Sequence, residues 1–272
     1  MRIAQLQTHV FREKDGNLEQ MASIMNELDG KDVDLVTAGE MFCCPYEVEL
    51  FSIYAEAEGG DMFNKLSELA KKHNVYLQAG TVPEIDHSGN IYNTAYVFDR
   101  SGKMIAKHRK AHLFDINISG GQSFKESDTL TAGDQITVFD TELCRMSMCI
   151  CFDCRFPEMS RIASQEGAEI LLVPAAFNMT TGPAHWEIMF RSRAIDNQIF
   201  VAGTSVARDM SSAYHAWGHS MIVDPWGTIL SEMDEKEGIN IIDIDLANIN
   251  RVRHQLPLMS ARRTDMYELK RI

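Results

Sequence analysis

The spacing of hydrophobic residues along the chain changes between helical and strand-like periods. In the first half, apolar residues spaced three and four positions apart predict helices at residues 17–28 and 61–73. Short apolar runs predict the strands of this half, at residues 3–8, 33–37, 75–82, 91–98 and 104–109. The last two strands flank residues 99–102, whose sequence DRSG is typical of a hairpin turn. The first half is therefore predicted to alternate strands with helices and to end in paired strands.

The second half repeats this order of elements without repeating the sequence. Its strands are predicted at residues 136–139, 145–150, 169–174, 199–206, 220–223, 228–231 and 239–244. One helix is predicted to begin at Phe156 and Pro157, and another to cover residues 184–197. Because the same order occurs twice, we expect an α/β fold, a four-layer α-β-β-α sandwich of two mixed sheets with helices outside. No linker divides the chain, so residues 1–272 are predicted to form a single domain.

The balance of charges narrows the range of partners. The 272 residues include 26 Lys and Arg against 39 Asp and Glu, which gives a formal net charge of −13. Nucleic acids and anionic membrane surfaces attract clustered positive charge, so neither is expected as a partner. A small anionic substrate is still compatible with this charge, because one local arginine can hold it.

The N-terminus and the cysteines indicate where the protein works. Residues 1–8 alternate like a strand and lack the apolar core of a secretory signal peptide. No apolar run approaches the roughly 20 residues needed to span a bilayer. Without an export signal, the six cysteines are expected to be reduced thiols and the expected location is the cytoplasm.

The sequence around Cys151 carries the clearest chemical signal. An apolar strand is predicted to end at Cys151, and a helix begins a few residues later near Pro157. A thiol close to a helix N-terminus is favoured as the thiolate, which is the form that attacks a carbonyl carbon. The backbone N–H of Phe152 would then point at the oxyanion that this attack creates. These features predict that Cys151 is a nucleophile.

Other interpretations of these cysteines stay open at this point. Cys151 and Cys154 form a C-x-x-C pair, which occurs in redox-active dithiols and in zinc sites. The sequence contains no second pair of this kind to complete a zinc site. A free cysteine on an apolar strand is also often part of the core, and Cys149 is expected to share the strand face of Cys151.

Two charged residues also end predicted strands. Burial of Glu40 would raise its pKa toward a value useful for a general base, and Lys110 would stabilise both a thiolate and an oxyanion. Exposure to solvent is the alternative for each. Because open α/β sheets assemble their sites from strand ends, Glu40, Lys110 and Cys151 are predicted to converge. Glu126 lies in the long loop at residues 114–133 and is a candidate second carboxylate.

These three motifs together resemble the nitrilase superfamily of carbon–nitrogen hydrolases, whose signature is a glutamate, a lysine and a cysteine in that order. The resemblance covers nearly the whole chain and rests on GEMF at residues 39–42, RKAHLF at 109–114 and CFDCRFPE at 151–158. It implies hydrolysis of an amide through a cysteine thioester, with no metal or organic cofactor. It also implies a homodimer or a larger homo-oligomer, built on the helices after Phe156 and at 184–197.

A closer resemblance is to the ω-amidases, which hydrolyse the terminal amide of α-ketoglutaramate and α-ketosuccinamate. The segments that carry it lie at residues 114–116, 124–127, 176–187 and 216–220. By this resemblance Glu126 is the second glutamate, which orients the substrate and Lys110. The residues expected to contact the substrate are Tyr46, Phe114, Phe177 and Asn178.

Several neighbouring activities remain alternatives. Phe152 and Asp153, which follow the cysteine, differ from the Trp-Glu of nitrilases and the Asn-Asp of N-carbamoylases, so amide hydrolysis is favoured. An amidase for deaminated glutathione or another aliphatic amide is the main alternative, and a non-enzymatic interaction protein is a further one. Gly39, where relatives usually carry proline, and Cys43, where they often carry asparagine, are departures near the pocket.

Overall fold

The first mixed sheet is built mainly from the first half of the chain. The computed structural model describes residues 1–118 and 123–272, so residues 119–122 of the predicted loop at 114–133 lie outside the described part. The strands follow the order β15 (Gly238–Asp243), β1 (Arg2–Gln7), β2 (Leu35–Ala38), β3 (Tyr76–Gln78), β5 (Ile91–Phe98) and β4 (Val82–Ile85). Strand β6 (Met104–Arg109) also pairs with β5. The strands β1, β2 and β3 are parallel, and the pairings of β15, β5, β4 and β6 are antiparallel.

The second mixed sheet is built from the second half. Its strands follow the order β14 (Ile229–Glu232), β13 (Met221–Val223), β12 (Phe200–Ser205), β11 (Ile170–Ala175), β10 (Arg145–Met148) and β9 (Thr137–Asp140). The central strands β10, β11 and β12 are parallel. Strands β7 (Asp115–Asn117) and β8 (Ser123–Lys125) form a small separate pair, which leads into the short 3-10 helix η1 (Glu126–Asp128).

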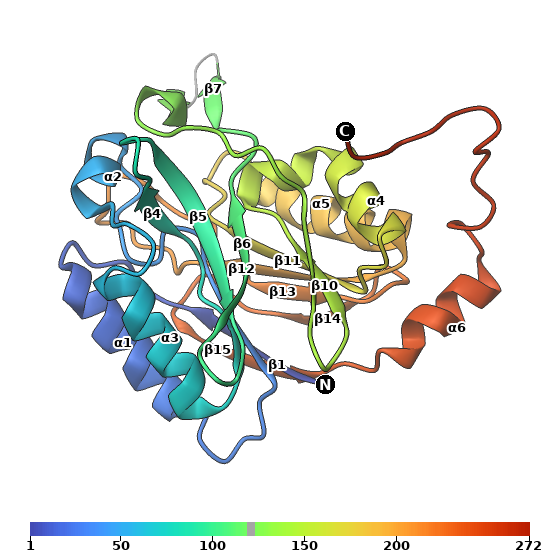
Figure 1. Cartoon of the computed structure of the whole chain (residues 1–272), viewed down its shortest axis with the longest axis horizontal. Coiled ribbons are helices and arrows are strands. Elements are labelled where there is room, and N and C mark those ends of the chain that lie inside the picture. Colours follow the sequence, from blue (N-terminus) through green and yellow to red (C-terminus); the bar gives the residue numbers. More distant parts are fainter. Residues whose placement is uncertain (119–122) are drawn as a thin grey trace.

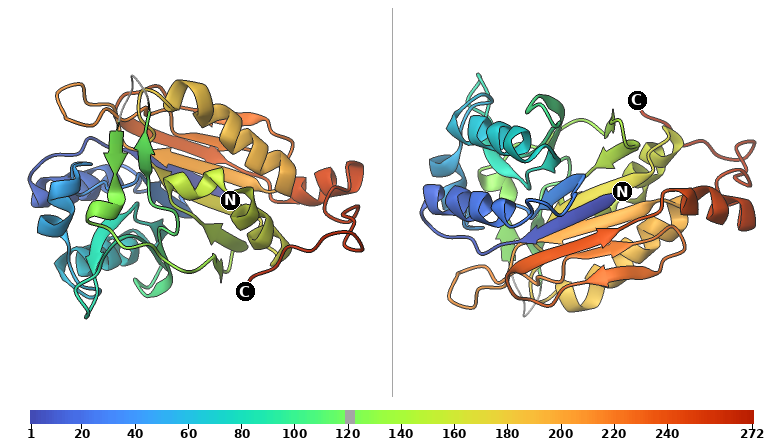
Figure 2. Two further views of the ribbon diagram at one scale, coloured as in Figure 1. Left: turned by 90° about the horizontal axis from the view of Figure 1, so that it is seen from above. Right: turned by 90° about the horizontal axis from the view of Figure 1, so that it is seen from below.

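Helices cover the outer face of each sheet. Helices α1 (Lys14–Asn26) and α3 (Asp61–His73) pack together outside the first sheet, and α4 (Pro157–Gln165) and α5 (Gly182–Asn197) pack together outside the second (Figures 1 and 2). The two sheets face each other where β1 and β2 meet β12. Buried hydrogen bonds join them there, from Gln5 Nε2 to Gly203 O (2.9 Å) and between the hydroxyls of Thr37 and Thr204 (2.7 Å). The predicted four-layer α-β-β-α sandwich is therefore confirmed.

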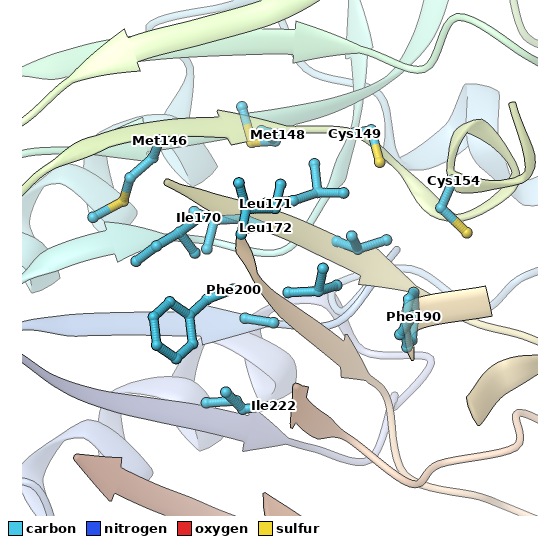
Figure 3. Close-up of a cluster of buried hydrophobic side chains, with 14 of the residues drawn as sticks. Met146, Met148, Cys149, Cys154, Ile170, Leu171, Leu172, Phe190, Phe200 and Ile222 are labelled. Atoms are coloured by element: carbon cyan, nitrogen blue, oxygen red, sulfur yellow. The ribbon is translucent and has the colours of Figure 1, made fainter. Parts of the chain in front are cut away.

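The apolar core of the second sheet explains why its strands read as continuous hydrophobic runs. Figure 3 shows part of this core, with Met148, Leu172 and Phe200 from β10, β11 and β12 and Phe190 from α5. Every residue of β11 and β12 is buried, because one face meets the first sheet and the other meets helices. No helix in the described part of the chain is long and apolar enough to cross a membrane.

Most predicted elements are found within a few residues of their expected ends, but two strands differ. The run predicted as one strand at residues 75–82 forms β3 and β4, with Gly80 between them in the left-handed region (φ 65°). A Cβ atom on Gly80 would stand 2.3 Å from the carbonyl oxygen of Gly39, so only glycine allows this bend. The strand predicted to end at Ile150 ends at Met148. Helices α2 (Val48–Tyr54) and α6 (Ala247–Gln255), and the β7–β8 pair, were not predicted.

Candidate active site

Glu40 lies in a buried turn directly after β2. The turn is fixed by a hydrogen bond from the backbone N–H of Met41 to Thr81 Oγ1 (2.8 Å). A Cβ atom on Gly39 would stand 2.5 Å from the backbone nitrogen of Val206, so this position leaves no room for a side chain. Only 1% of Glu40 is exposed. The carboxylate predicted at this strand end is therefore buried rather than solvated.

Lys110, directly after β6, joins Glu40 to the second glutamate. Its Nζ donates to Glu40 Oε1 (2.8 Å), Glu126 Oε1 (2.9 Å) and Tyr46 Oη (3.2 Å). The Tyr46 hydroxyl lies within donating distance of both carboxylates, and Asn93 Nδ2 donates to Glu40 Oε1 (2.8 Å). All these side chains are buried. We call Glu40, Lys110, Glu126 and Tyr46 the lysine cluster.

The two carboxylates and the ammonium group change each other's proton affinity. Burial alone would lower the pKa of Lys110, but the charges of Glu126 and Glu40 outweigh burial and raise it, so the lysine stays protonated. Burial raises the pKa of Glu40, and Lys110 partly opposes that increase. A carboxylate whose pKa is raised accepts a proton more readily than an ordinary one does.

One oxygen of the lysine cluster is left available for chemistry. Glu40 Oε2 is buried and accepts no N–H or O–H hydrogen bond from the residues that the structure describes. The thiol of Cys151 interacts with this carboxylate, lowering the pKa of Glu40, and the charge of Lys110 acts in turn on Cys151. The three residues predicted to converge therefore meet in one buried site.

Cys151 begins the short 3-10 helix η2 (Cys151–Arg155), in a conformation that few residues other than glycine adopt (φ 44°). Burial and the charge of Glu40 raise the pKa of its thiol, whereas Lys110 and the backbone N–H of Ala176 lower it. The net shift is strongly upward, so the prediction of a thiol already favoured as thiolate is wrong. Desolvation outweighs the helix terminus, and Cys151 needs a base to lose its proton.

A small cavity of about 40 Å³ lies beside this site. Its lining includes Glu40, Tyr46, Ala176 and Tyr214. The ring of Tyr214 packs on that of Tyr46, with 4.6 Å between centroids, and its hydroxyl donates to the carbonyl oxygen of Ala176. Tyr214, which sequence reasoning missed, thus connects the lysine cluster to the strand end beside the cysteine.

The residues predicted to contact substrate lie around this site in different ways. Tyr46 belongs to the lysine cluster, and the backbone N–H of Phe114 donates to Glu126 Oε2 (2.6 Å). The ring of Phe177 lies under the guanidinium group of Arg155, 4.8 Å from its centroid. Asn178 Oδ1 accepts hydrogen bonds from the backbone of the turn that follows it. Their contact with a substrate remains a prediction.

Other site residues were not singled out from the sequence. Asn93 lies within an apolar strand, and a buried amide in such a strand is the only signal that marks it. Asp153 was noted only as the second residue after the cysteine, yet it accepts hydrogen bonds from His108 and His112. Arg155 was noted only as part of the cysteine motif. No metal-binding group of three or more His, Cys, Asp or Glu residues is found among the described residues.

Comparison with known proteins agrees with this geometry. Residues 2–254 match the family model described as carbon-nitrogen hydrolase. The chain is 44% identical to omega-amidase NIT2 of Bos taurus, over 99% of this chain and 97% of that protein. It is 46% identical to nitrilase homolog 2 of Dictyostelium discoideum, over 95% of this chain and 79% of that protein.

A solved structure gives the same picture. Nit3 of Saccharomyces cerevisiae, described as a member of branch 10 of the nitrilase superfamily, matches with a TM-score of 0.89. The two are 37% identical, and the match covers 97% of this chain and 96% of that one. The resemblance inferred from the three motifs is thereby confirmed, and this chain belongs to the carbon–nitrogen hydrolase family.

Proposed function

We propose that this protein is an ω-amidase, which hydrolyses the terminal amide of a short α-keto acid amide such as α-ketoglutaramate or α-ketosuccinamate. The observation that carries the proposal is the meeting of Cys151, a buried carboxylate oxygen of Glu40 and the ammonium group of Lys110 in one enclosed site. The similarity to proteins named omega-amidase, over nearly the whole chain, supports the choice of substrate.

The reaction begins with the transfer of a proton. Glu40 Oε2 takes the proton of the Cys151 thiol, and the thiolate attacks the carbon of the terminal amide. The carbonyl oxygen becomes an oxyanion, which the charge of Lys110 and the backbone N–H of Phe152 stabilise. Among the three hydrogen bonds of Lys110 Nζ, the one to Tyr46 is the longest at 3.2 Å, so we expect it to yield first to the oxyanion.

The second stage releases the products. The tetrahedral intermediate collapses, the carbon–nitrogen bond breaks, and the nitrogen leaves as ammonia with the proton that Glu40 held. Water then attacks the thioester while Glu40 accepts its proton. Glu40 returns that proton to the sulfur as the carbon–sulfur bond breaks, which restores the Cys151 thiol and releases the acid product, ionised at neutral pH. Glu126 holds Lys110 in place throughout, through the 2.9 Å bond between its Oε1 and Nζ.

The substrate of this reaction carries a carboxylate, and Arg155 is suited to bind it. Its guanidinium group lies over Phe177 and donates toward His185 Nδ1 (3.1 Å). Among the described residues, it forms no ion pair with an acidic side chain, unlike Arg109, which pairs with Glu84. Its charge acts on the buried hydroxyl of Tyr214, which itself borders the cavity. A carboxylate at the far end of a short ω-amide would therefore find a free cation there.

An ammonia-release assay tests the proposal. We expect the protein to release ammonia from α-ketoglutaramate and α-ketosuccinamate faster than from N-carbamoyl compounds, nitriles, deaminated glutathione or neutral aliphatic amides. Cys151→Ser should reduce the rate by at least about 10³-fold, because an unactivated hydroxyl replaces the nucleophile. Ammonia release that survives this substitution would rule out the mechanism. A preference for deaminated glutathione would keep the mechanism and change the substrate.

We further propose that the protein is a cytoplasmic homodimer. The six cysteines are free thiols, which suits a reducing compartment. Helix α5 exposes Ile188 and Ile195 on its outer surface, and burying such residues favours association. Light scattering after gel filtration should give twice the mass of one chain, and the double variant Ile188→Asp, Ile195→Asp should give the monomer mass. A monomeric wild type would contradict this assembly.

A further inference from the structure

Asp153 is a buried carboxylate that takes no part in the chemistry described above. Its side chain is completely buried. It accepts hydrogen bonds from His108 Nε2 (3.0 Å), from His112 Nδ1 (2.8 Å), and from the backbone N–H groups of His112 (2.8 Å), Ala111 (3.4 Å) and Ile150 (3.0 Å). Burial alone would raise the pKa of Asp153, but the bonds from His108 and His112 outweigh it and hold the pKa below its ordinary value. Asp153 is therefore ionised.

The donors of these bonds come from the two segments that carry the reacting groups. His108, Ala111 and His112 surround Lys110 in the chain. Ile150 directly precedes Cys151, and the backbone N–H of Asp153 donates back to the carbonyl oxygen of Ile150 (2.9 Å). We call Asp153, His108 and His112 the aspartate clamp.

The hydrogen bonds of the aspartate clamp fix the backbone around both Cys151 and Lys110. Cys151 adopts an unfavourable backbone conformation, which persists only when its neighbours are fixed. The reciprocal bonds between residues 150 and 153 fix the chain on both sides of that residue. The same carboxylate fixes the chain on both sides of Lys110. Without it, the segments that carry the sulfur and the ammonium group would have fewer direct links.

We propose that Asp153 is a positioning residue that sets the separation of the Lys110 ammonium group and the Cys151 sulfur during catalysis. The proposal deepens the proposed function and rests on it. Among the described residues, the hydrogen bonds of Asp153 go neither to the cavity lining nor to the lysine cluster, so it acts through the residues that it holds. Its loss should reduce turnover with little effect on substrate binding.

The test compares Asp153→Asn with a control that removes a buried hydrogen-bonded side chain far from the site. Asn17 is suitable, because within the described part of the chain its amide bonds only to the backbone of residues 11 and 13, just before α1, and 1% of it is exposed. Three quantities are measured for wild type, Asp153→Asn and Asn17→Ala. These are kcat and KM for ammonia release and the rate at which iodoacetamide alkylates Cys151, which is located by peptide mapping.

We expect Asp153→Asn to lower kcat by about 30-fold or more and to change KM by less than about threefold. Alkylation of Cys151 should slow by about tenfold and require a higher pH, because Lys110 supports the thiolate less well. Asn17→Ala should leave all three quantities unchanged. A merely structural role would loosen the site and speed alkylation of this buried thiol. Faster alkylation therefore overturns the proposal, whatever the value of kcat. Unchanged alkylation, or a kcat near that of wild type, overturns it as well.

A second pair of variants decides the matter if Asp153→Asn does not fold. His112→Phe keeps the stacking of the ring on Phe156 (3.6 Å between centroids) but removes the bond from Nδ1 to Asp153. His112→Asn supplies an amide nitrogen near the position of Nδ1. We expect His112→Phe to lower kcat and alkylation by about fivefold, and His112→Asn to restore most of the loss. Equal rates for both variants and wild type overturn the proposal. Because alkylation needs no substrate, this comparison stands even if wild type releases no ammonia from any ω-amide.

Discussion

Two buried clusters of charge draw on the segment around Lys110, and they are built on opposite principles. In the aspartate clamp, one carboxylate accepts five hydrogen bonds, and both of its oxygens are occupied. In the lysine cluster, two carboxylates share one ammonium group, and Glu40 Oε2 accepts no N–H or O–H hydrogen bond from the described residues. The hydrogen-bond acceptors of the aspartate clamp are all used, whereas the lysine cluster keeps one unused carboxylate oxygen next to the thiol of Cys151.

The pKa shifts of the two carboxylates have opposite signs, and so do their effects on stability. The pKa of Asp153 is lowered in the folded protein, so its charge stabilises the fold above the pKa of the unfolded state. This contribution is lost as pH falls toward the folded pKa. The pKa of Glu40 is raised, so folding favours its protonated form, and its contribution is lost as pH rises through the folded pKa. At neutral pH the clamp therefore stabilises the fold while the charge of Glu40 opposes it. Reactive sites commonly show this conflict between stability and activity.

The largest effect should come from Glu40→Gln, which removes the base and keeps the shape. The amide oxygen can still accept from Lys110 and Asn93, and the cluster changes from two carboxylates and one cation to a neutral pair. We expect kcat to fall by about 10³-fold or more, because general base catalysis supplies up to about 10⁴-fold. The free energy of unfolding should stay equal or rise by about 1 kcal/mol. Urea titration and ammonia release measure the two effects.

A loss of stability comparable to the loss of activity would contradict this comparison. It would mean that Glu40 stabilises the fold, as Asp153 does. The matched control is Gln5→Met, which removes a buried amide bonded between the sheets away from the lysine cluster. That variant should lose stability and keep its kcat.

The next effect in size is the loss of stability in Asp153→Asn. An amide cannot accept on both sides, so its NH₂ group would face backbone donors whichever way it turns. Breaking a buried charged network in this way should cost about 3 kcal/mol at pH 7. The difference from wild type should shrink as pH falls below about 4, where the unfolded aspartate binds a proton. Urea unfolding at several pH values measures it, and a difference that grows toward acid pH would contradict the sign.

The contrast between the clusters also explains what the sequence could predict. Glu40 and Cys151 follow strands with a clear apolar run, and Lys110 follows a predicted strand of mixed composition, so their position at one edge follows from the order of elements. Glu126 was a candidate from its place in the long loop, but its role as the second glutamate came from the resemblance, because the short strands β7 and β8 that lead to it have no clear period. The fold was predictable for the same reason: buried parallel strands such as β11 read as uninterrupted apolar runs.

Other features depend on contacts between distant parts of the chain and leave no local pattern. Pairing of β15 with β1 joins residues more than two hundred positions apart. The upward shift in the pKa of Cys151 depends on burial by surrounding elements and on the charge of Glu40, whereas the local motif suggested a downward shift. Asp153 finds two of its partners in His108 and His112, which lie in a strand-end segment more than forty residues earlier. A histidine beside a lysine in the sequence gives no sign of which carboxylate it will meet.

The smallest effect, and the finest test of the comparison, is expected for Tyr46→Phe. The Tyr46 hydroxyl accepts from Lys110 and has one proton to share between Glu126 and Glu40. Phenylalanine keeps the aromatic ring, whose centroid lies 5.6 Å from that of Phe51 and 4.6 Å from that of Tyr214. Losing one hydrogen bond should lower kcat by about three- to tenfold and leave KM unchanged, if the hydroxyl serves only to orient Lys110. A rise in KM with unchanged kcat, measured on α-ketoglutaramate, would instead place Tyr46 on the substrate, as the sequence predicted. In that case the carboxylates of Glu40 and Glu126 would be sufficient to orient Lys110 without the Tyr46 hydroxyl.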